Sequence, residues 1–347
     1  MHRAVILGGT GLIGRAAALR LLRSGWQVTV TGRDPARVPA ELTAAGASFL
    51  AANRRDNGQL AAAVGEGADL LVDCVCYTAA DASQLLPFLP GVSSTVMISS
   101  KAVYADAEGR HPNSAAAPRF DGPIRETQPT VAAGDGDYNT REGYGANKVA
   151  AEQVLLGSVS PVTVVRPSKV HGPGAQRPRE WVFVRRVLDQ RPVILLAHRG
   201  AGVDHPTAAA NTAALIEVAA ARPGSRILNS ADPDAPSGLE ISRIVANHLG
   251  HRWDEVLLSD DADPALGRHP WDTRYPIVLD MTAAAELGYV PAGDYATTVA
   301  DEIDWLVRSP RSGPGAVPPA SEDDFFAPLF DYPAEDRYLA SRRSGSA

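Results

Sequence analysis

A glycine-rich turn near the N-terminus constrains the fold of this chain more than any other feature. The apolar run Ala4–Leu7 precedes the turn Gly8–Gly14 (GGTGLIG), and helical periodicity follows over Leu12–Arg23. In such a strand–turn–helix unit, the first N–H groups and the positive dipole end of the helix face the turn, where they can bind a phosphate. Three glycines at this spacing are typical of a unit that binds a dinucleotide through its pyrophosphate.

Strand and helix patterns alternate beyond this turn. The alternation continues to the apolar run Thr95–Ser99, and it resumes with a helix over Tyr144–Leu156 and a strand over Val162–Val165. It predicts an α/β fold with a doubly wound parallel sheet of the Rossmann type. The other expected strands are Gln27–Thr31, Ala47–Ala51 and Asp69–Cys76, and the other expected helices are Asp34–Ala45, Asn57–Val64, Ala80–Phe88, Glu180–Leu188, Thr207–Ala221, Leu239–Leu249 and Thr297–Val307.

The chain divides by pattern into three parts. We expect a dinucleotide-binding domain over 1–171, a smaller mixed α/β lobe over 172–308 that binds substrate, and a tail over 309–347. The segment 106–142 is rich in Pro, Gly, Ala and acidic residues, and a loop this long inside a domain is usually functional or mobile. We expect it to contribute to the substrate cleft. Aromatic residues suggest that the first part of the tail packs on the protein, whereas 342–347 is expected to be disordered.

Composition excludes several classes of function. The 347 residues carry a formal net charge of −7, which disfavours nucleic-acid binding because that requires a basic face. No apolar run is long enough to cross a bilayer and no signal peptide is recognisable, so a cytoplasmic protein without membrane association is expected. Cys74 and Cys76 fall in a predicted buried strand, as small buried residues do in a reducing compartment. No metal site is expected, since no ligands at a usual spacing accompany them.

The end of the second predicted strand bears on which dinucleotide is bound. NAD-binding units carry an acidic residue there for the ribose 2′-hydroxyl, whereas the first charged residue here is Arg33. A guanidinium suits the 2′-phosphate of NADP, and Asp34 before Pro35 is better explained as the cap of the next helix. NADP(H) is therefore favoured. The alternative, in which Arg33 is solvated and Asp34 faces the ribose of NAD(H), stays open.

Three side chains could carry the chemistry. The fifth predicted strand ends in Ser99-Ser100, and Tyr144 and Lys148 lie four residues apart on one helical face. An ammonium group near a phenol favours the phenolate and lowers the pKa of the phenol from about 10 towards neutrality. Tyr144 could then exchange a proton with a carbonyl or alcohol, while the serine hydroxyl hydrogen-bonds the same oxygen. Beside a nicotinamide, this trio fits hydride transfer.

Together these residues resemble the extended branch of the short-chain dehydrogenase/reductase superfamily, which includes the nucleotide-sugar epimerases and dehydratases. The resemblance covers about residues 1–308 and agrees with the fold expected above. Beyond the glycine turn, it rests on Ser100–Tyr104 (SKAVY), Tyr144–Lys148 (YGANK), Arg166–Pro173 (RPSKVHGP), Val203–Pro206 (VDHP) and Asp280–Pro291, which contains Leu287-Gly288-Tyr289.

The resemblance implies roles for individual residues. Tyr144 would be the acid/base, Lys148 would also hold the nicotinamide ribose, and Ser100 would orient the substrate oxygen. The pair Cys76-Tyr77 would lie along the cofactor, and Asp56 would contact adenine. The full expected set of cofactor-binding residues is Gly8, Thr10, Gly11, Leu12, Ile13, Arg33, Asp56, Cys76, Tyr77, Lys148, Pro167 and Ser168.

Several positions depart from the family pattern. Lys169 and His171 replace an asparagine and a tyrosine that face the substrate in relatives, which suggests a polar or anionic substrate group, with a surface role as the alternative. His205 is a second unusual histidine and is interpreted as structural. Lys101-Ala102 occupies the place of the acidic pair of sugar 4,6-dehydratases and cannot perform their elimination step, which disfavours a dehydratase. Lys101, Lys169 and His171 are the candidate substrate residues.

These features predict an NADP(H)-dependent oxidoreductase, a carbonyl reductase or the reverse alcohol dehydrogenase, that acts on a small molecule. An NAD-dependent nucleotide-sugar epimerase, which would use the same three residues with a retained cofactor, is the alternative. A non-catalytic protein that senses NADP is disfavoured, because such proteins commonly lose the tyrosine or the lysine. The resemblance also implies a homodimer formed through two helices of each subunit.

Overall fold

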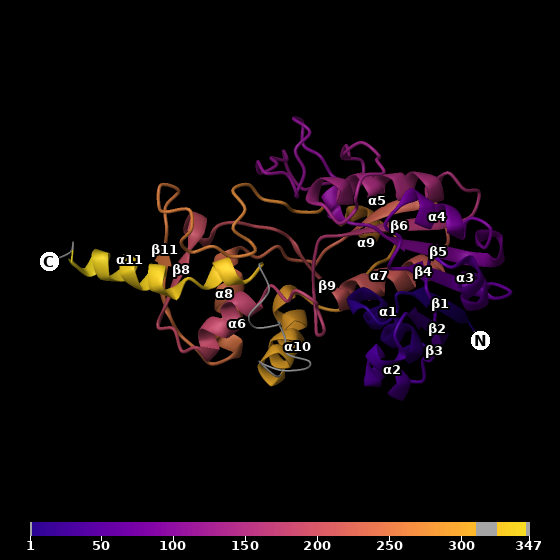
Figure 1. Cartoon of the computed structure of the whole chain (residues 1–347), viewed down its shortest axis with the longest axis horizontal. Helices are drawn as coiled ribbons and strands as arrows, with labels where there is room; N and C mark the ends of the chain where they lie inside the picture. The colour runs from indigo at the N-terminus through magenta and orange to yellow at the C-terminus, as the bar shows by residue number, and fades with distance from the viewer. Residues whose placement is uncertain (1, 310–324, 345–347) are drawn as a thin grey trace. The chain divides into compact units, whose positions relative to one another are not determined.

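The computed structural model describes residues 2–309 and 325–344, and the chain forms two compact units (Figure 1). Unit 1 comprises Met1–Val170, Pro206–Pro233 and Val278–Asp294, and unit 2 comprises His171–His205, Asp234–Ile277 and Tyr295–Ala347. The first crossing, after Val170, lies close to the expected boundary. The segment 172–308 does not form one block, however, because two parts of it return to unit 1 and supply two strands and two helices.

Unit 1 is built around a seven-stranded sheet in which every neighbouring pair of strands is parallel. The strand order is β10-β6-β5-β4-β1-β2-β3. From β1 the chain adds strands first on one side, as β2 and β3, and then on the other side, beginning with β4, so the order of connection reverses between β1 and β4. Ligands of such sheets bind at the carboxyl ends of the strands, at this reversal. The expected α/β class is confirmed. The strands are β1 (Arg3–Leu7), β2 (Gln27–Gly32), β3 (Ser48–Ala51), β4 (Ala68–Asp73), β5 (Val92–Ile98), β6 (Val162–Pro167) and β10 (Arg226–Ser230).

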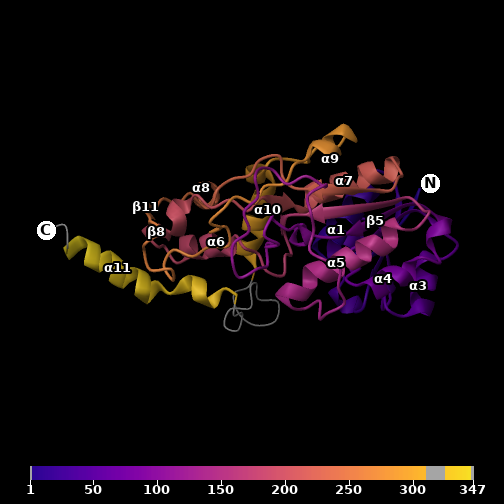
Figure 2. The same ribbon diagram turned by 90° about the horizontal axis from the view of Figure 1, so that it is seen from above.

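Helices cover both faces of this sheet, as Figure 2 shows. α1 and α7 pack together on one face, where small buried side chains such as Ala17 and Ala213 allow close contact. The other face is covered by α3, α4 and α5. A separate short sheet joins β7 (Lys169–His171) to β9 (Pro206–Ala208). The helices of unit 1 named so far are α1 (Leu12–Arg23), α3 (Asn57–Val64), α4 (Ala79–Leu85), α5 (Arg141–Leu156) and α7 (Ala209–Ala221).

One expected helix is split. The segment from Asp34 to Ala45 forms the 3-10 turn η1 (Pro35–Arg37) and then the short helix α2 (Ala40–Ala44). The break falls at Val38, which adopts an extended conformation, because the residue before a proline is driven out of the helical region. The proline that causes the break, at position 39, was visible in the sequence.

The strand expected to run to Cys76 ends at Asp73. The Asp73 carboxylate turns back and accepts a hydrogen bond from the Val75 N–H at 2.9 Å, which closes a turn where the strand would have continued. Cys74 and Cys76 therefore follow the strand and do not share one of its faces. Burial raises the pKa of both thiols, that of Cys74 to about 12, so both are neutral thiols at neutral pH.

Unit 2 has its own hydrophobic core. Three helices pack around it beside a pair of parallel strands. These elements are α6 (Trp181–Leu188), α8 (Gly238–His248), α10 (Tyr295–Arg308), β8 (Val193–Leu196) and β11 (Asp254–Leu257). Among the described residues, no helix combines the length and the apolar character needed to cross a bilayer.

The described part of the tail packs on unit 2. Phe326 is buried in the core of this unit, and helix α11 (Tyr332–Ser344) follows. Glu335 of α11 forms a buried ion pair with Arg186, with a nitrogen–oxygen distance of 2.5 Å. The expectation of disorder over 342–347 was therefore wrong for 342–344, which the anchored helix includes; 345–347 lie outside the described residues.

Candidate active site

The glycine turn between β1 and α1 leaves no room for a side chain at Gly8, Gly9 or Gly14. Gly8 has a φ of +73°, and a Cβ on Gly14 would lie 2.6 Å from the Gly8 carbonyl oxygen. A Cβ on Gly9 would lie 2.5 Å from the Cβ of Val30, a constraint that the sequence analysis did not anticipate. No side chain caps the start of α1 after Gly11, and its first turn holds no acidic residue. The N–H groups there can therefore bind a phosphate.

The end of β2 lies beside this turn, since a Cβ on Gly32 would approach the Thr10 hydroxyl to 3.0 Å. Asp34 caps η1, and its Oδ1 accepts a hydrogen bond from the Ala36 N–H at 2.9 Å. The expected capping role of Asp34 is thus confirmed. Arg33 is exposed, and no carboxylate in 2–309 or 325–344 pairs with it. Two further predicted cofactor residues, Leu12 and Ile13, are half-buried in the first turn of α1.

Asp56, predicted to contact adenine, begins helix α3. Its Oδ1 accepts a hydrogen bond from the Gln59 N–H at 2.9 Å, so this carboxylate acts as the helix N-cap. Nearby, Arg54 and Asp73 form a buried ion pair with a nitrogen–oxygen distance of 2.6 Å, which joins the residues after β3 to the end of β4. The adenine contact of Asp56 stays a prediction.

Lys148 of α5 is 2% exposed and lies at the ends of β4 and β5. Its Nζ donates hydrogen bonds to the carbonyl oxygens of Cys76 and Ile98, at 2.7 and 3.0 Å. The same nitrogen lies 4.4 Å from the centre of the Tyr77 ring and 5.9 Å from the centre of the Tyr144 ring. The predicted catalytic lysine and tyrosine are therefore brought together with the Cys76-Tyr77 pair, at the carboxyl edge of the sheet.

Ser100 follows β5 and begins the 3-10 turn η3 (Lys101–Val103). Its Oγ accepts a hydrogen bond from the Ala102 N–H at 3.1 Å. Helix α5 packs on this turn, and a Cβ on Gly145 would lie only 2.7 Å from the Ala102 carbonyl oxygen. Because Gly145 follows Tyr144, its lack of a side chain lets the tyrosine's helical turn approach the serine turn. Lys101, a candidate substrate residue, is 7% exposed within η3.

An aromatic stack connects Tyr77 to the 106–142 loop. The rings of Tyr77 and Tyr138 are stacked, with centroids 5.3 Å apart and an interplanar angle of 13°. The guanidinium of Arg55 lies 5.3 Å from the centre of the Tyr138 ring. Burial raises the pKa of Tyr77 to about 12, so the phenol stays protonated at neutral pH. The loop is thus attached beside Lys148 by a contact for which the sequence held no signal.

The end of β6 supplies the remaining predicted cofactor residues. Pro167 ends the strand. Ser168 follows, and its N–H donates to the carbonyl oxygen of Ser230 at 2.9 Å. The same N–H lies 3.1 Å from the Thr207 Oγ1. Lys169 is half-buried in β7.

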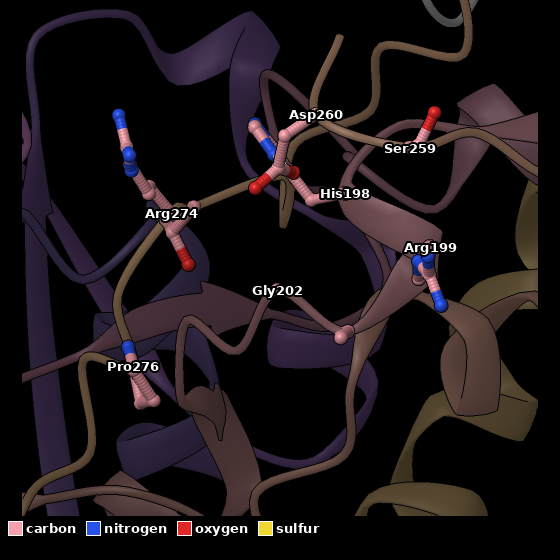
Figure 3. A pocket seen from close by; sticks show the side chains of 9 residues that line it. His198, Arg199, Gly202, Ser259, Asp260, Arg274 and Pro276 are labelled. Carbon is pink, nitrogen blue, oxygen red and sulfur yellow. The ribbon is translucent and has the colours of Figure 1, made fainter. Parts of the chain in front are cut away.

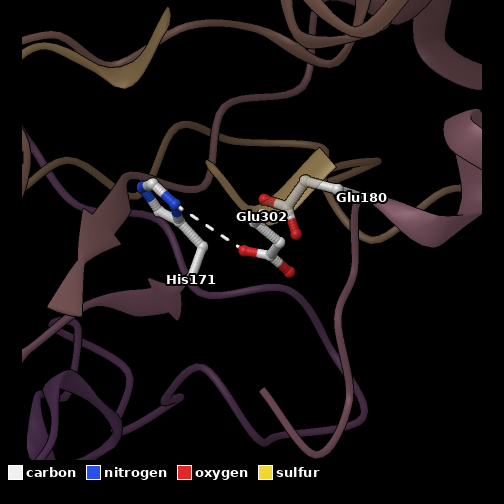
Figure 4. A group of neighbouring side chains, drawn as sticks. All are labelled: His171, Glu180 and Glu302. Carbon is white, nitrogen blue, oxygen red and sulfur yellow. Dashed lines mark ion pairs between the residues drawn. The ribbon is translucent and has the colours of Figure 1, made fainter. Parts of the chain in front are cut away.

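His171 lies in a buried cluster of unit 2 with Glu180 and Glu302 (Figure 4). The three side chains are at most 2% exposed, and one ligand atom from each lies within 4.8 Å of the others. The Gly172 N–H donates to Glu302 at 2.5 Å, and the Tyr295 hydroxyl donates to Glu180 at 3.0 Å. Such burial leaves little surface for a substrate, so the predicted substrate role of His171 is not favoured by its position.

A histidine with two carboxylates could hold a metal ion, but the charges of this cluster favour a proton. Burial and the charge of Glu180 raise the pKa of Glu302 well above its ordinary value. The half-buried Arg179 interacts electrostatically with both carboxylates. One proton on Glu302 leaves the two glutamates and Arg179 neutral together, whereas a divalent ion would give the cluster excess positive charge. We therefore expect a carboxyl–carboxylate pair here.

Unit 2 also contains a pocket of about 430 Å³ that the sequence analysis missed. Figure 3 shows Arg199 and Arg274 on either side of Gly202. The Nδ1 atom of His198 lies 2.8 Å from the Oδ1 atom of Asp260. His198 and Arg199 have φ values of +48° and +55°, a left-handed conformation that costs energy in residues with side chains and is common at functional sites. The residues come from three separate segments, so no local motif announced the pocket.

Comparison with known proteins places this geometry in context. Residues 4–205 match the model of the NAD dependent epimerase/dehydratase family, and no curated protein matches the sequence. A solved UDP-N-acetylglucosamine 4-epimerase from Bacillus cereus has a TM-score of 0.67 at 14% identity, over 89% of this chain and 100% of that chain. The dTDP-glucose 4,6-dehydratase of Bacillus anthracis in complex with NAD has a TM-score of 0.66 at 14% identity, over 88% and 97%. MoeE5 in complex with UDP-glucose and NAD has a TM-score of 0.64 at 18% identity, over 89% and 99%.

Proposed function

Because the chain belongs to the NAD dependent epimerase/dehydratase family, it is a nicotinamide-dependent enzyme, and we propose that it epimerises a sugar nucleotide. The observation that carries this proposal is the convergence of Tyr144 and Lys148 with the Ser100 turn, through the close contact at Gly145. From the sequence alone the epimerase was the alternative to a carbonyl reductase. The family match makes the epimerase the preferred proposal. The glycine turn and the uncapped start of α1 fit the pyrophosphate of the cofactor.

The residues of unit 1 would divide the work as follows. The glycine turn and the start of α1 would hold the dinucleotide, and its nicotinamide would supply an acceptor and donor of hydride for a hydroxyl-bearing carbon. Tyr144 takes the hydroxyl proton as the carbonyl forms and gives a proton back when the hydride returns to the opposite face. The Ser100 hydroxyl donates a hydrogen bond to the reacting oxygen, and the Lys148 ammonium places a positive charge beside the Tyr144 ring. The absence of an acidic pair at Lys101-Ala102 leaves no residue there to eliminate water, which disfavours a dehydratase.

The pocket of unit 2 supports a phosphate-bearing substrate. Arg199 and Arg274 both line it, and guanidinium groups bind phosphate oxygens with paired hydrogen bonds. Two arginines flanking one cavity suit a diphosphate better than a neutral metabolite. The similar structures include an epimerase of a UDP-sugar and a complex with UDP-glucose, which supports a sugar nucleotide as the substrate class.

A second candidate, an NADP(H)-dependent carbonyl reductase, is favoured by one observation at the end of β2. The Asp34 carboxylate is engaged in capping η1, and the exposed Arg33 guanidinium lies next to it in the chain. The ribose 2′ position of the cofactor is expected at this place. The Arg33 guanidinium is available there to bind a 2′-phosphate, whereas the Asp34 carboxylate is already hydrogen-bonded as a helix cap. The NADP preference therefore remains a proposal beside the family's NAD dependence.

One experiment distinguishes the sugar-nucleotide epimerase from the carbonyl reductase. The purified protein is extracted to identify any bound dinucleotide and is then incubated with UDP-glucose, UDP-N-acetylglucosamine and dTDP-glucose. An epimerase yields a second sugar nucleotide without net consumption of added NADH or NADPH. Stoichiometric oxidation of added NADPH with a reduced product would instead establish the reductase. Arg274→Ala should raise the KM for the sugar nucleotide, whereas an unchanged KM would remove the pocket from the proposal.

A further inference from the structure

A buried polar network lies behind the three catalytic residues and has no part in the mechanism above. Its centre is Glu152 of α5, which is 2% exposed. Glu152 lies four residues after Lys148 and eight after Tyr144, so the three side chains share one side of the helix. The Glu152 carboxylate accepts a hydrogen bond from the Ser99 hydroxyl. Ser99 directly precedes Ser100, so one carboxylate links the helix of the tyrosine and lysine to the strand end of the serine.

Arg166 holds this carboxylate in place from the adjacent strand β6. Its Nη2 and Nε donate to the two oxygens of Glu152, at 2.5 and 3.1 Å, which is the paired geometry that fixes both groups in orientation. Arg166 is 3% exposed. Burial alone would lower the pKa of Arg166, but the hydrogen bonds and charge of Glu152 outweigh it and raise the pKa above its ordinary value. Arg166 is therefore charged where it meets the Glu152 side chain.

The network continues to the 106–142 loop. The Arg166 guanidinium lies 4.8 Å from the centre of the Tyr104 ring, and the Tyr104 hydroxyl donates to Asn229 at 2.6 Å. The Asn229 side-chain amide in turn donates to the carbonyl oxygens of Ile124 and Asp280, at 2.8 and 3.1 Å. Its backbone N–H donates to Glu126 at 2.7 Å. Two residues of the loop are thus attached to the same buried charges that link α5 to Ser99.

We propose that Glu152 is a positioning residue, which sets the separation between Ser100 and the Tyr144–Lys148 face by binding Ser99, with Arg166 as its counter-charge. The inference rests on the proposed function, because it assigns Glu152 to the same hydride transfer. A reacting oxygen must meet the serine and tyrosine hydroxyls together, and small errors of placement between catalytic groups are costly. Glu152 itself touches neither substrate nor cofactor.

The first test is Glu152→Gln, which keeps the size of the side chain and removes its charge. We expect kcat to fall by roughly a hundredfold, while the KM for the sugar nucleotide stays within about twofold. Gln153→Glu, a one-charge change at the next and exposed position of α5, should leave both constants unchanged. A Glu152→Gln variant with wild-type kcat would overturn the proposal.

A double variant separates positioning from stability. Glu152→Leu with Arg166→Met replaces the ion pair by apolar side chains, and such replacements of buried pairs often preserve stability. We expect the urea midpoint to stay near that of the wild type, while kcat remains low because Ser99 has lost its acceptor. Recovery of kcat together with stability would show a merely structural role. If the double variant does not fold, Ser99→Ala gives the same information, since it removes the hydroxyl donor alone and should also lower kcat with KM preserved.

A measurement without substrate keeps the inference distinct from the proposed function. Amide hydrogen exchange of the segment 99–103 should be faster in Glu152→Gln than in the wild type and in Gln153→Glu, because the serine turn is then no longer held by α5. Equal exchange rates in the three proteins would contradict the proposal. If the wild type turns over none of the three sugar nucleotides, the proposed function fails, and this exchange comparison alone decides whether Glu152 holds the turn.

Discussion

At the scale of single residues, the decisive side chain is Tyr144, whose ring centre lies 5.9 Å from the ammonium of Lys148. Tyr144→Phe removes only the hydroxyl that we propose exchanges a proton. We expect kcat to fall by roughly a hundred- to ten-thousandfold, the usual contribution of a positioned acid/base, with affinity for the dinucleotide retained. Turnover and dinucleotide binding of the purified variant check this. Hydride transfer at the wild-type rate would exclude Tyr144 as the acid/base.

Arg33 is the residue on which the proposed NADP preference rests. Its exposed side chain follows β2, and a charge-assisted contact to a 2′-phosphate would be lost in Arg33→Ala. We expect affinity for NADPH to fall roughly tenfold or more and affinity for NADH to change little. Titration of both cofactors into wild type and variant measures the ratio. Arg23→Ala at the end of α1 is the control. An unchanged ratio of the affinities for NADPH and NADH in Arg33→Ala would contradict the NADP preference and favour NAD as the cofactor.

At the scale of elements, the contact between α5 and η3 depends on Gly145. Glycine inside a helix normally costs about 1 kcal/mol relative to alanine, so Gly145→Ala would ordinarily stabilise the protein. Here the added Cβ would lie 2.7 Å from the Ala102 carbonyl oxygen, and we expect both the urea midpoint and kcat to fall. A more stable and fully active Gly145→Ala variant would show that α5 need not approach the serine turn this closely.

Elements could be predicted where their causes are local. The bounds of α1 and α3 follow from periodicity and caps, and both agree with the expected ranges. The expected strand to Cys76 was too long, because the Asp73 carboxylate accepts a hydrogen bond from the Val75 N–H and closes a turn there. The same carboxylate is held by Arg54, which lies nineteen residues earlier in the chain. Of the site, the glycine turn and the Tyr–Lys pair were readable as motifs. The pocket at Arg199 and the ion pair of Glu152 join distant segments, which no local pattern reveals.

At the scale of the whole molecule, the glutamate pair of unit 2 makes stability depend on pH. Burial and Glu180 raise the pKa of Glu302 above its ordinary value of 4.5, so the folded protein holds a proton that the unfolded chain releases above that pH. The contribution is fully present below pH 4.5 and is lost as the pH rises through the raised pKa. The facing groups are Arg179, His171 and Glu180.

Urea unfolding followed across this range tests the effect. We expect the wild type to lose stability relative to Glu302→Gln as the pH rises, because the amide cannot ionise. The difference between the two proteins should be smallest at the acidic end of the range. Parallel stability curves for wild type and variant would mean that the pair holds no proton at neutral pH.

The alternation of the chain between the two units has a consequence for biosynthesis. The chain crosses after residues 170, 205, 233, 277 and 294. When the ribosome has released the segment that carries the glycine turn and the Tyr–Lys pair, α7 is still unmade, and the apolar side of α1 that it covers faces water. Unit 1 can therefore complete its fold only after more than a hundred further residues have been synthesised. A gene fragment that stops at residue 171 should yield aggregated protein, and chaperones should engage the growing chain during that interval.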